Sequence, residues 1–234
     1  MRNKKSNAAE QHILFEDTSS PYSEAVQNIQ VNLDFSSFDN KSKVIAVTSS
    51  VPHEGKSTLV ANLAYIYGKK EFKVLLIDLD LRKSSLHRFF HVENDKGITD
   101  LCVKKAEEND ILKRTEHLDL ATSGTHTPFV GKLLESNALT DFIEKMKQKY
   151  DYIFIDTPPV LVSSDALLIS RFVDQFLLVV QYGKTKKSDL NETIRQFKNN
   201  NIEISGIVMS NVSNKRGQYG YSYNYQYSSK NHKK

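Results

Sequence analysis

The chain has 234 residues, of which 39% are hydrophobic and 26% are charged, and its formal net charge is +4. This size and composition suit one α/β domain with a full core and short tails. Apolar runs such as VLLI and FLLVV are far shorter than the roughly 20 residues that cross a bilayer, and the polar start MRNKKSNAAEQ is unlike a signal peptide. Cys102 is the only cysteine, which excludes an internal disulfide, disfavours a zinc site and fits a reducing cytosol.

The first elements in chain order are a polar segment and a helix. Residues 1–20 have the composition of a flexible segment. Residues 21–38 follow a Ser-Pro start and carry Ala25, Ile29 and Leu33 at helical spacing, which predicts a helix.

From residue 44 onward, apolar runs alternate with helical patterns. The apolar runs are continuous, as is typical of strands that are buried on both faces. The alternation therefore predicts a mostly parallel central sheet with helices on both faces, in which ligands bind at the carboxyl ends of the strands. The predicted strands are residues 44–48, 74–78, 118–122, 152–156, 175–180 and 204–210. The predicted helices are residues 57–69, 139–149, 165–172 and 187–200.

A strand, a short loop ending in Gly55-Lys56-Ser57 and a helix follow one another between residues 44 and 64. This is the layout of a phosphate-binding loop, in which backbone N–H groups and a helix N-terminus converge on phosphate oxygens. Gly55 permits close approach, Lys56 supplies a charge for the outer phosphates, and the Ser57 hydroxyl is the expected Mg²⁺ ligand. The triplet alone also occurs in ordinary strand–turn–helix units, but its flanking elements favour a nucleotide site. The expected ATP contacts are Ser50, Val51, Pro52, His53, Glu54, Gly55, Lys56, Ser57 and Thr58.

The loop departs from the pattern GxxxxGK[ST]. Ser50 stands at the first Gly position, and His53 stands where related loops usually have Gly. Histidine is among the non-Gly residues that tolerate positive φ, so we expect the loop to close on phosphate.

Two further strands end in acids. Asp78 ends one strand and is followed by Asp80 and Arg82 at alternate positions, and Asp156 ends another strand just before Pro158-Pro159. One such Asp is usually turn chemistry. Two of them downstream of a phosphate loop, on the same rim of a parallel sheet, favour carboxylates that hold Mg²⁺ directly or through its waters.

The end of the chain differs in composition from the rest. Tyrosines recur there at every second position between Gly, Ser, Asn and Gln, and residues 215–234 carry five Lys or Arg and no acid. Such a segment cannot bury enough apolar surface to fold alone. It suits a phosphoacceptor, a solvated low-complexity tail, a contact for anionic membranes, or a stacking surface for nucleic-acid bases. The expected organisation is a flexible segment at 1–20, a P-loop domain at 21–211 and a disordered tail at 212–234. The repeated tyrosines are Tyr219, Tyr221, Tyr223, Tyr225 and Tyr227.

Three segments together resemble a known family. SSVPHEGKST resembles a Walker A loop, VLLIDLDLR the second acidic motif called Walker A′, and YIFIDTPP a Walker B motif. Over about residues 20 to 227 this combination is similar to the bacterial tyrosine kinases of capsule and exopolysaccharide synthesis, which have a deviant-Walker P-loop fold. The DxDxR form of the second motif separates these kinases from septum-positioning and partitioning ATPases. Those ATPases usually carry a signature lysine where this chain has Val51.

The resemblance implies an ATP- and Mg²⁺-dependent protein tyrosine autokinase that phosphorylates its C-terminal tyrosines and regulates polysaccharide synthesis and export. Asp80 is our choice for the acid on the acceptor side, because the phenol arrives protonated and needs a nearby base. Arg82 is either a charge partner of the acids or part of a subunit contact. The implied catalytic residues are Lys56, Asp78, Asp80 and Arg82, and the implied metal ligands are Ser57, Asp78 and Asp156.

The resemblance also implies partners. Gram-positive members separate the kinase from a transmembrane polysaccharide co-polymerase that activates it, and this chain resembles that separate cytoplasmic kinase at the inner face of the membrane. A cognate tyrosine phosphatase and self-association are expected, and nucleic acid is not. The family's ring-assembly motif ExxRxxR reads Glu24, Gln27 and Gln30 here. Glutamine lacks the charge and the bidentate pairing of arginine, so this motif does not predict a ring octamer, and the alternative is that residues 24–34 only pack against the domain.

Two other interpretations remain open from the sequence. One is a positioning-type ATPase, in which water is the acceptor. The other is a nucleotide-gated binding module whose tail contacts nucleic acid.

Overall fold

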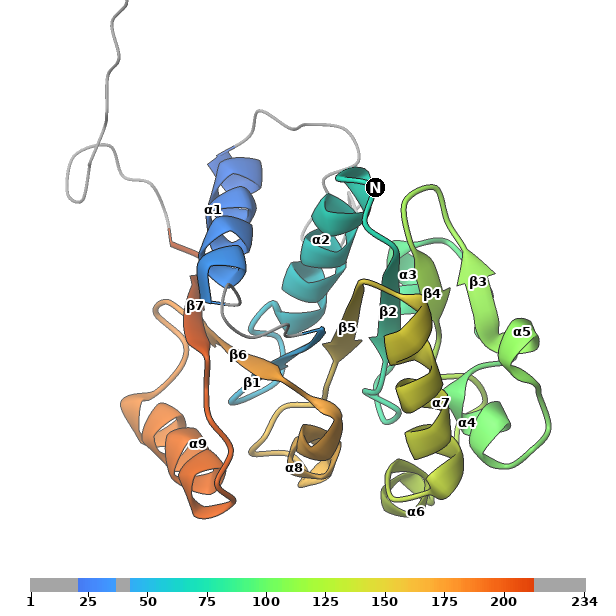
Figure 1. The fold of residues 1–234 in the computed structure, drawn as a ribbon. Helices are drawn as coiled ribbons and strands as arrows, with labels where there is room; N and C mark the ends of the chain where they lie inside the picture. The colour runs from blue at the N-terminus through green and yellow to red at the C-terminus, as the bar shows by residue number, and fades with distance from the viewer. Residues whose placement is uncertain (1–20, 37–42, 213–234) are drawn as a thin grey trace, which may run out of the picture.

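The computed structural model describes residues 21–36 and 43–212, and Figure 1 shows a central sheet with helices on both faces. In this part of the chain, seven strands form one sheet in the order β3-β4-β2-β5-β1-β6-β7. All neighbouring strands are parallel except β3 and β4, so the predicted mostly parallel sheet is confirmed. The strands are β1 Val44–Ser49, β2 Val74–Asp78, β3 Leu112–Arg114, β4 Asp119–Ala121, β5 Tyr152–Asp156, β6 Gln175–Gln181 and β7 Gly206–Ser210.

The helices form two layers, one on each face of the sheet. One apolar core lies between the sheet and α1 to α3, and the other lies between the sheet and α4 to α9. A 3-10 turn, Ser170–Phe172, follows α8. The helices are α1 Pro21–Ser36, α2 Lys56–Lys69, α3 Leu86–Phe89, α4 Ile98–Cys102, α5 Glu108–Ile111, α6 Val130–Leu134, α7 Asn137–Lys149, α8 Asp165–Ile169 and α9 Lys187–Asn199.

The central strands are buried on both faces, as their continuous apolar runs predict. In β1, Ile45 and Val47 belong to the core under α1 and α2, whereas Val44 and Ala46 belong to the opposite core. The edge strand β7 differs, because its side chains alternate between half-buried and exposed positions. The prediction that every strand is buried on both faces is therefore wrong for β7, which has a neighbour only on the β6 side in the described residues.

Several short elements lack any periodic signal in the sequence. The helices α3 to α6 have four or five residues each, and the strand β3 has three. Elements of this length are fixed by tertiary contacts rather than by a hydrophobic pattern. The predicted helix at 165–172 is confirmed in part, since it divides into α8 and the 3-10 turn.

The buried face of α1 is rotated from the predicted one. Val26 and Leu33 are buried and Ile29 is half-buried, but Ala25 is exposed. Valine at the neighbouring position offers more apolar area to α2 than alanine does, so the helix turns it inward. Within residues 21–36 and 43–212, no helix combines the length and the apolar character needed to cross a bilayer. The predictions about residues 1–20 and about the tail from residue 213 onward lie outside the described residues.

Candidate active site

The sheet brings the three predicted motifs to one rim. β5 lies between β1 and β2, and Asp156 is in register with Asp78 on one side and with Val47 on the other. The phosphate loop begins directly after β1. Acids that are far apart in sequence therefore end beside this loop, as the carboxyl ends of parallel strands should.

Lys56 is the centre of this cluster. Its Nζ lies 2.9 Å from Oδ2 of Asp80 and 3.3 Å from Oδ1 of Asp156, and it donates a hydrogen bond of 3.0 Å to Oγ of Ser57. Burial alone would lower the pKa of Lys56, but the Asp156 and Asp80 carboxylates outweigh it and raise that pKa. Lys56 is therefore held as a cation between two acids.

Asp78 is fully buried, and backbone groups of the following turn occupy its oxygens. Its Oδ1 accepts a hydrogen bond from the amide of Asp80 (3.2 Å), and its Oδ2 accepts from the amides of Ser85 (3.0 Å) and Leu86 (3.1 Å). Burial, and then the nearby Asp156, raise the pKa of Asp78. These contacts make Asp78 a brace for the turn that carries Asp80, and its assignment as a metal ligand stays a prediction.

Asp156 offers a free carboxylate oxygen. Its Oδ2 is buried and has no hydrogen-bond partner in the part of the chain that the structure describes. Burial raises the pKa of Asp156, although Lys56 and Ser57 act in the opposite direction. A buried, unpaired carboxylate oxygen beside a Ser hydroxyl is a donor set that suits a hard cation such as Mg²⁺. Among residues 21–36 and 43–212, no three His, Cys, Asp or Glu side chains gather closely enough to hold a metal by themselves, so phosphate oxygens and water would complete the coordination.

The unusual residues of the phosphate loop each have a structural explanation. His53 has φ of 64° and Gly55 has φ of 97°, so the conformation that the sequence led us to expect at His53 is present. Ser50 is fully buried, and its Oγ accepts a hydrogen bond of 2.9 Å from Thr193 of α9. The Ser50 side chain thus has a partner behind the loop, and its φ is not positive, so glycine is not needed there. Closure of the loop on phosphate stays a prediction.

Two segments that the sequence did not single out support the loop from behind. Glu54 is buried, its Oε2 accepts from the amide of Val51 (3.0 Å), and its Oε1 accepts from the hydroxyl of Thr185. The backbone oxygen of Glu54 accepts a hydrogen bond of 2.7 Å from Oγ of Ser210, the last residue of β7. The β6–α9 connection and the end of β7 therefore fix the position of the loop.

Lys184, in the same β6–α9 connection, adds a second support. Its Nζ donates to the backbone oxygens of Pro52 (3.0 Å) and His53 (3.1 Å). These contacts join residues more than 130 positions apart in the sequence, so no local sequence pattern could predict them.

Arg82 pairs with an acid that the sequence analysis missed. Its Nε and Nη2 donate to the two carboxylate oxygens of Asp165 at 2.6 and 3.2 Å. Asp165 is buried at the start of α8, whereas the Arg82 side chain is 46% exposed. Arg82 is therefore ion-paired with Asp165 rather than with the strand-end acids that the sequence analysis named, and a subunit contact stays a prediction.

The residues predicted for oligomer contact are divided by the structure. Glu24 and Gln27 are exposed on α1, but Gln30 is buried between α1 and α2. Gln30 accepts a hydrogen bond from Lys70 and donates one to Asp34. This packing agrees with the alternative that α1 lies against its own domain, and a contact between subunits through Glu24 and Gln27 stays a prediction.

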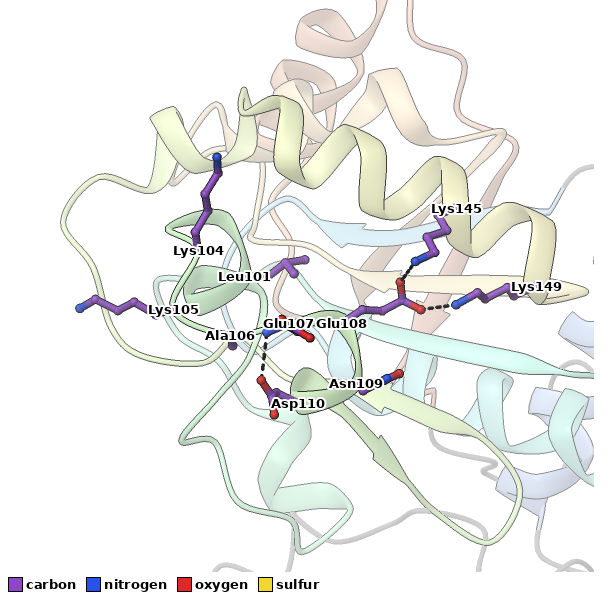
Figure 2. A pocket seen from close by; sticks show the side chains of 10 residues that line it. All are labelled: Leu101, Lys104, Lys105, Ala106, Glu107, Glu108, Asn109, Asp110, Lys145 and Lys149. Carbon is purple, nitrogen blue, oxygen red and sulfur yellow. Dashed lines mark hydrogen bonds and ion pairs between the residues drawn. The ribbon is translucent and has the colours of Figure 1, made fainter.

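A surface cavity of about 850 Å³ lies away from these motifs, between the α4–α5 region and α7 (Figure 2). Glu108 is ion-paired there with Lys145 and Lys149, while Lys104 and Lys105 point away from that pair. Lys104 and Lys105 do not join Lys145 and Lys149 at Glu108, and no residue of the three motifs lines the cavity. The candidate active site is therefore the phosphate loop and its rim rather than this cavity.

Known proteins match both the sequence and the structure. A family model described as an AAA domain matches residues 42–206. The chain is 35% identical to the tyrosine-protein kinase YwqD of Bacillus subtilis over 202 residues, which cover 85% of each chain. It is 29% identical to the tyrosine-protein kinase ptk of Acinetobacter johnsonii over 85% of this chain but only 27% of that longer protein.

Solved structures agree with these relatives. The crystal structure of the chimerical protein CapA2B2 superposes with a TM-score of 0.81 and 32% identity, covering 84% of this chain and 88% of the other. The kinase domain of the Escherichia coli tyrosine kinase ETK superposes with a TM-score of 0.84 and 26% identity, covering 96% of this chain and 88% of the other. The septum site-determining protein MinD of Pyrococcus horikoshii shares the fold. It superposes with a TM-score of 0.60 and 23% identity, covering 71% of this chain and 69% of the other. This chain belongs to the bacterial tyrosine kinase family.

Proposed function

We propose that the chain is an ATP- and Mg²⁺-dependent tyrosine autokinase that phosphorylates its C-terminal tyrosines. The main support is the placement of Lys56 between Asp80 and Asp156 at the start of α2. This arrangement puts a cation for phosphates, an acid for a metal and an acid for a phenol within one small rim.

The loop and the start of α2 are built to hold an anion. The amides after β1 and the positive end of α2 favour phosphate groups, and Lys56 adds its charge. Ser57 and Asp156 would hold Mg²⁺, because the hydroxyl and the unpaired Oδ2 are hard oxygen donors. When bound, Mg²⁺ supplies neutralisation of the negative charge on the phosphates.

Asp80 is suited to act on the incoming tyrosine. In this structure its carboxylate is occupied by Lys56, and ATP phosphates would compete for the same ammonium group. Oδ2 of Asp80 would then be free to orient the phenol, whose pKa is about 10, and to take its proton, while Oδ1 accepts a hydrogen bond of 3.0 Å from the amide of Lys83. The tyrosine oxygen forms a bond to the γ-phosphorus as the bond from that phosphorus to the ADP oxygen breaks.

The tail begins at the right place to reach this site. β7 is parallel to β6, and its last residue, Ser210, is hydrogen-bonded to the phosphate loop. Tyr219 and Tyr227 lie 9 and 17 positions beyond Ser210, and a flexible chain of these lengths spans roughly 15–25 Å. That length permits transfer within one subunit or to a neighbour, and the family resemblance favours the neighbour.

The proposed setting is the inner face of the cell membrane, where the kinase regulates capsular or exopolysaccharide synthesis and export. A transmembrane co-polymerase would recruit and activate it, a cognate phosphatase would reverse the modification, and subunits would associate. The similarity to a chimerical protein, CapA2B2, supports the idea that a second polypeptide acts with such a kinase.

Incubation with ATP and Mg²⁺, followed by mass spectrometry of the tail, tests the proposal. We expect phosphotyrosine between residues 219 and 227, increased by the cytoplasmic segment of an activating adaptor and abolished by Lys56→Met. Release of phosphate without phosphotyrosine, with the adaptor segment present, would instead establish a positioning-type ATPase. Salt-sensitive, tail-dependent binding of single-stranded nucleic acid without phosphotyrosine would establish the binding module.

A further inference from the structure

The edge strand β7 carries an uncovered apolar strip. Ile207 is 52% exposed and Met209 is 56% exposed. They are in register with Leu178 and Val180 of β6, so they lie on the same face of the sheet as those residues. We refer to Ile207 and Met209 as the edge strip.

The helix that covers this face stops short of the edge strip. α9 packs over β6, where the rings of Phe197 and Phe176 meet edge to face with centroids 5.1 Å apart. Ile194 of α9 is itself 38% exposed, and it lines a groove of about 420 Å³ together with Ile202 and Ile204. Lys198, Asn201 and Glu203 also line this groove, so apolar side chains on the segment that leads into β7 are interspersed with polar ones.

An uncovered apolar edge strand of this kind can pair with a strand of another chain and promote aggregation. Its free edge presents backbone groups that can pair with another strand, and natural sheets usually block such edges with charges, prolines or a covering segment. Among the described residues, nothing pairs with β7 on the side away from β6. The edge therefore calls for an extended partner with apolar side chains on one face.

The chain itself contains a segment of that description immediately downstream. Tyrosine recurs at every second position from Tyr219 to Tyr227, with small or polar residues between. Side chains alternate between the two faces of a strand, so an extended conformation would place all of these rings on one face. Asn211 has φ of 58° just after β7, which starts a change of chain direction, and residues 211–218, with Gly217, are long enough for a hairpin connection.

We propose that the tyrosine-rich tail docks on the free edge of β7 of its own subunit as an antiparallel strand, with its tyrosine rings over the edge strip. The docked tail holds tyrosines away from the active-site rim. Docking itself needs no kinase activity, although its regulatory meaning rests on the proposed function.

β7 is shorter than the tyrosine segment, so only part of that segment can dock at one time. Five residues of β7 extend about 17 Å, and the nine residues from Tyr219 to Tyr227 extend about 30 Å, so about three tyrosines fit at one time. A slip of two residues returns tyrosine to the same face, so several registers are equivalent. Each register leaves a different tyrosine free for phosphorylation. A phosphate group, with a charge of about −1.5 to −2, opposes burial against the edge strip and releases the tail.

The tail of the same subunit is a better occupant than a second copy. Two exposed side chains and one short strand offer far less than the roughly 800 Å² per partner of a standard protein interface. A covalently attached segment has an effective concentration in the millimolar range, so it can occupy a site too small for a separate molecule.

Hydrogen exchange of the tail tests the proposal in the full chain. The Lys56→Met background keeps every tyrosine unphosphorylated, and millisecond exchange read by mass spectrometry reports on residues 219–227. We expect exchange about tenfold slower than in the same chain carrying Ile207→Ser and Met209→Ser, which corresponds to a docked fraction near 90%. Changing the tail tyrosines to Phe should keep this protection, and changing them to Ser should remove it.

Val103→Ser is the matched control, because Val103 is 50% exposed at the end of α4, away from the edge strip. It should leave tail exchange unchanged, and thermal melting confirms that each variant is folded. Equal exchange with and without the edge-strip substitutions would overturn the proposal, as would protection that rises with protein concentration, which would assign the edge to a second copy. A tail that is phosphorylated but unprotected refutes docking alone, whereas a protected tail that is never phosphorylated refutes the kinase proposal alone.

Discussion

Lys56 begins α2 and Asp80 follows β2, yet Nζ of the first lies 2.9 Å from Oδ2 of the second. The pair exists because β1 and β2 flank β5, whose own acid, Asp156, lies on the other side of the same ammonium group. In the proposed function, ATP phosphates would compete with these two carboxylates for Lys56.

Asp80→Asn should separate ATP binding from phosphoryl transfer. Removing one carboxylate leaves only Asp156 to compete for Lys56, so ATP affinity should be unchanged or higher, whereas tail phosphorylation should fall about 10²- to 10⁴-fold if Asp80 is the base. Titration calorimetry and tail mass spectrometry measure the two quantities. Asp141→Asn, on the exposed face of α7, should change neither, and an equal loss of binding and transfer in Asp80→Asn would contradict the assigned role.

Arg82 and Asp165 should behave as one unit. Because the bidentate pair joins the turn after β2 to α8, Arg82→Ala and Asp165→Ala should each lower phosphorylation, and the double variant should be no worse than the more severe single variant. We expect each single variant to lower the free energy of unfolding by about 1 kcal/mol, a value reduced for the solvent exposure of Arg82.

Urea unfolding and initial-rate kinetics give these values for Arg82 and Asp165. The exposed pair Arg195–Glu192 on α9 serves as the control, and Arg195→Ala should have no measurable effect. Additive losses in the Arg82–Asp165 cycle would show that the two residues act independently.

Lys184→Met should weaken ATP binding indirectly, because Lys184 supports the phosphate loop from behind. Lys184 holds the backbone oxygens of Pro52 and His53, and losing these contacts should lower ATP affinity about 3- to 10-fold, or roughly 1 kcal/mol. A fluorescent ATP analogue measures the change. Lys187→Met, at the exposed start of α9, removes the same charge without a contact to the loop, so an equal effect of both variants would point to long-range charge instead.

Asp100 should give the fold an acid-sensitive element. Its carboxylate accepts hydrogen bonds from the amide of Gly97 (3.0 Å) and from the amide (2.9 Å) and hydroxyl (2.7 Å) of Thr125. Burial would raise the pKa of Asp100, but these hydrogen bonds outweigh it, and the pKa lies below its usual range. A carboxyl with a lowered folded-state pKa stabilises the fold above its unfolded pKa of about 3.9, and that stability is lost as pH falls through the folded pKa.

Asp100→Asn should therefore lower the free energy of unfolding by about 1–3 kcal/mol at neutral pH and by less below about pH 4. Urea unfolding of both proteins at several pH values measures the difference. A penalty that does not change with pH would show that charge on Asp100 is not the source.

The sequence predicted those parts of the site that depend on strand order. Asp78 and Asp156 each end an apolar run, and parallel strands bring such ends together by geometry alone. Asp165 and Lys184 could not be found in this way, because their partners lie 83 and more than 130 positions away and no local pattern marks them. The orientation of α1 was likewise decided by its contact with α2, since helical spacing alone did not distinguish Ala25 from Val26.

Ser210 has a consequence that reaches beyond the phosphate loop. Its hydroxyl is bonded to Glu54, and a Cβ at position 55 would lie only 3.7 Å from its own Cβ. The residue that ends β7 thus packs directly against the turn of the predicted phosphate loop, two positions before the described chain ends. We therefore expect a movement of that turn to be transmitted to the end of β7, from which the sequence continues to the repeated tyrosines.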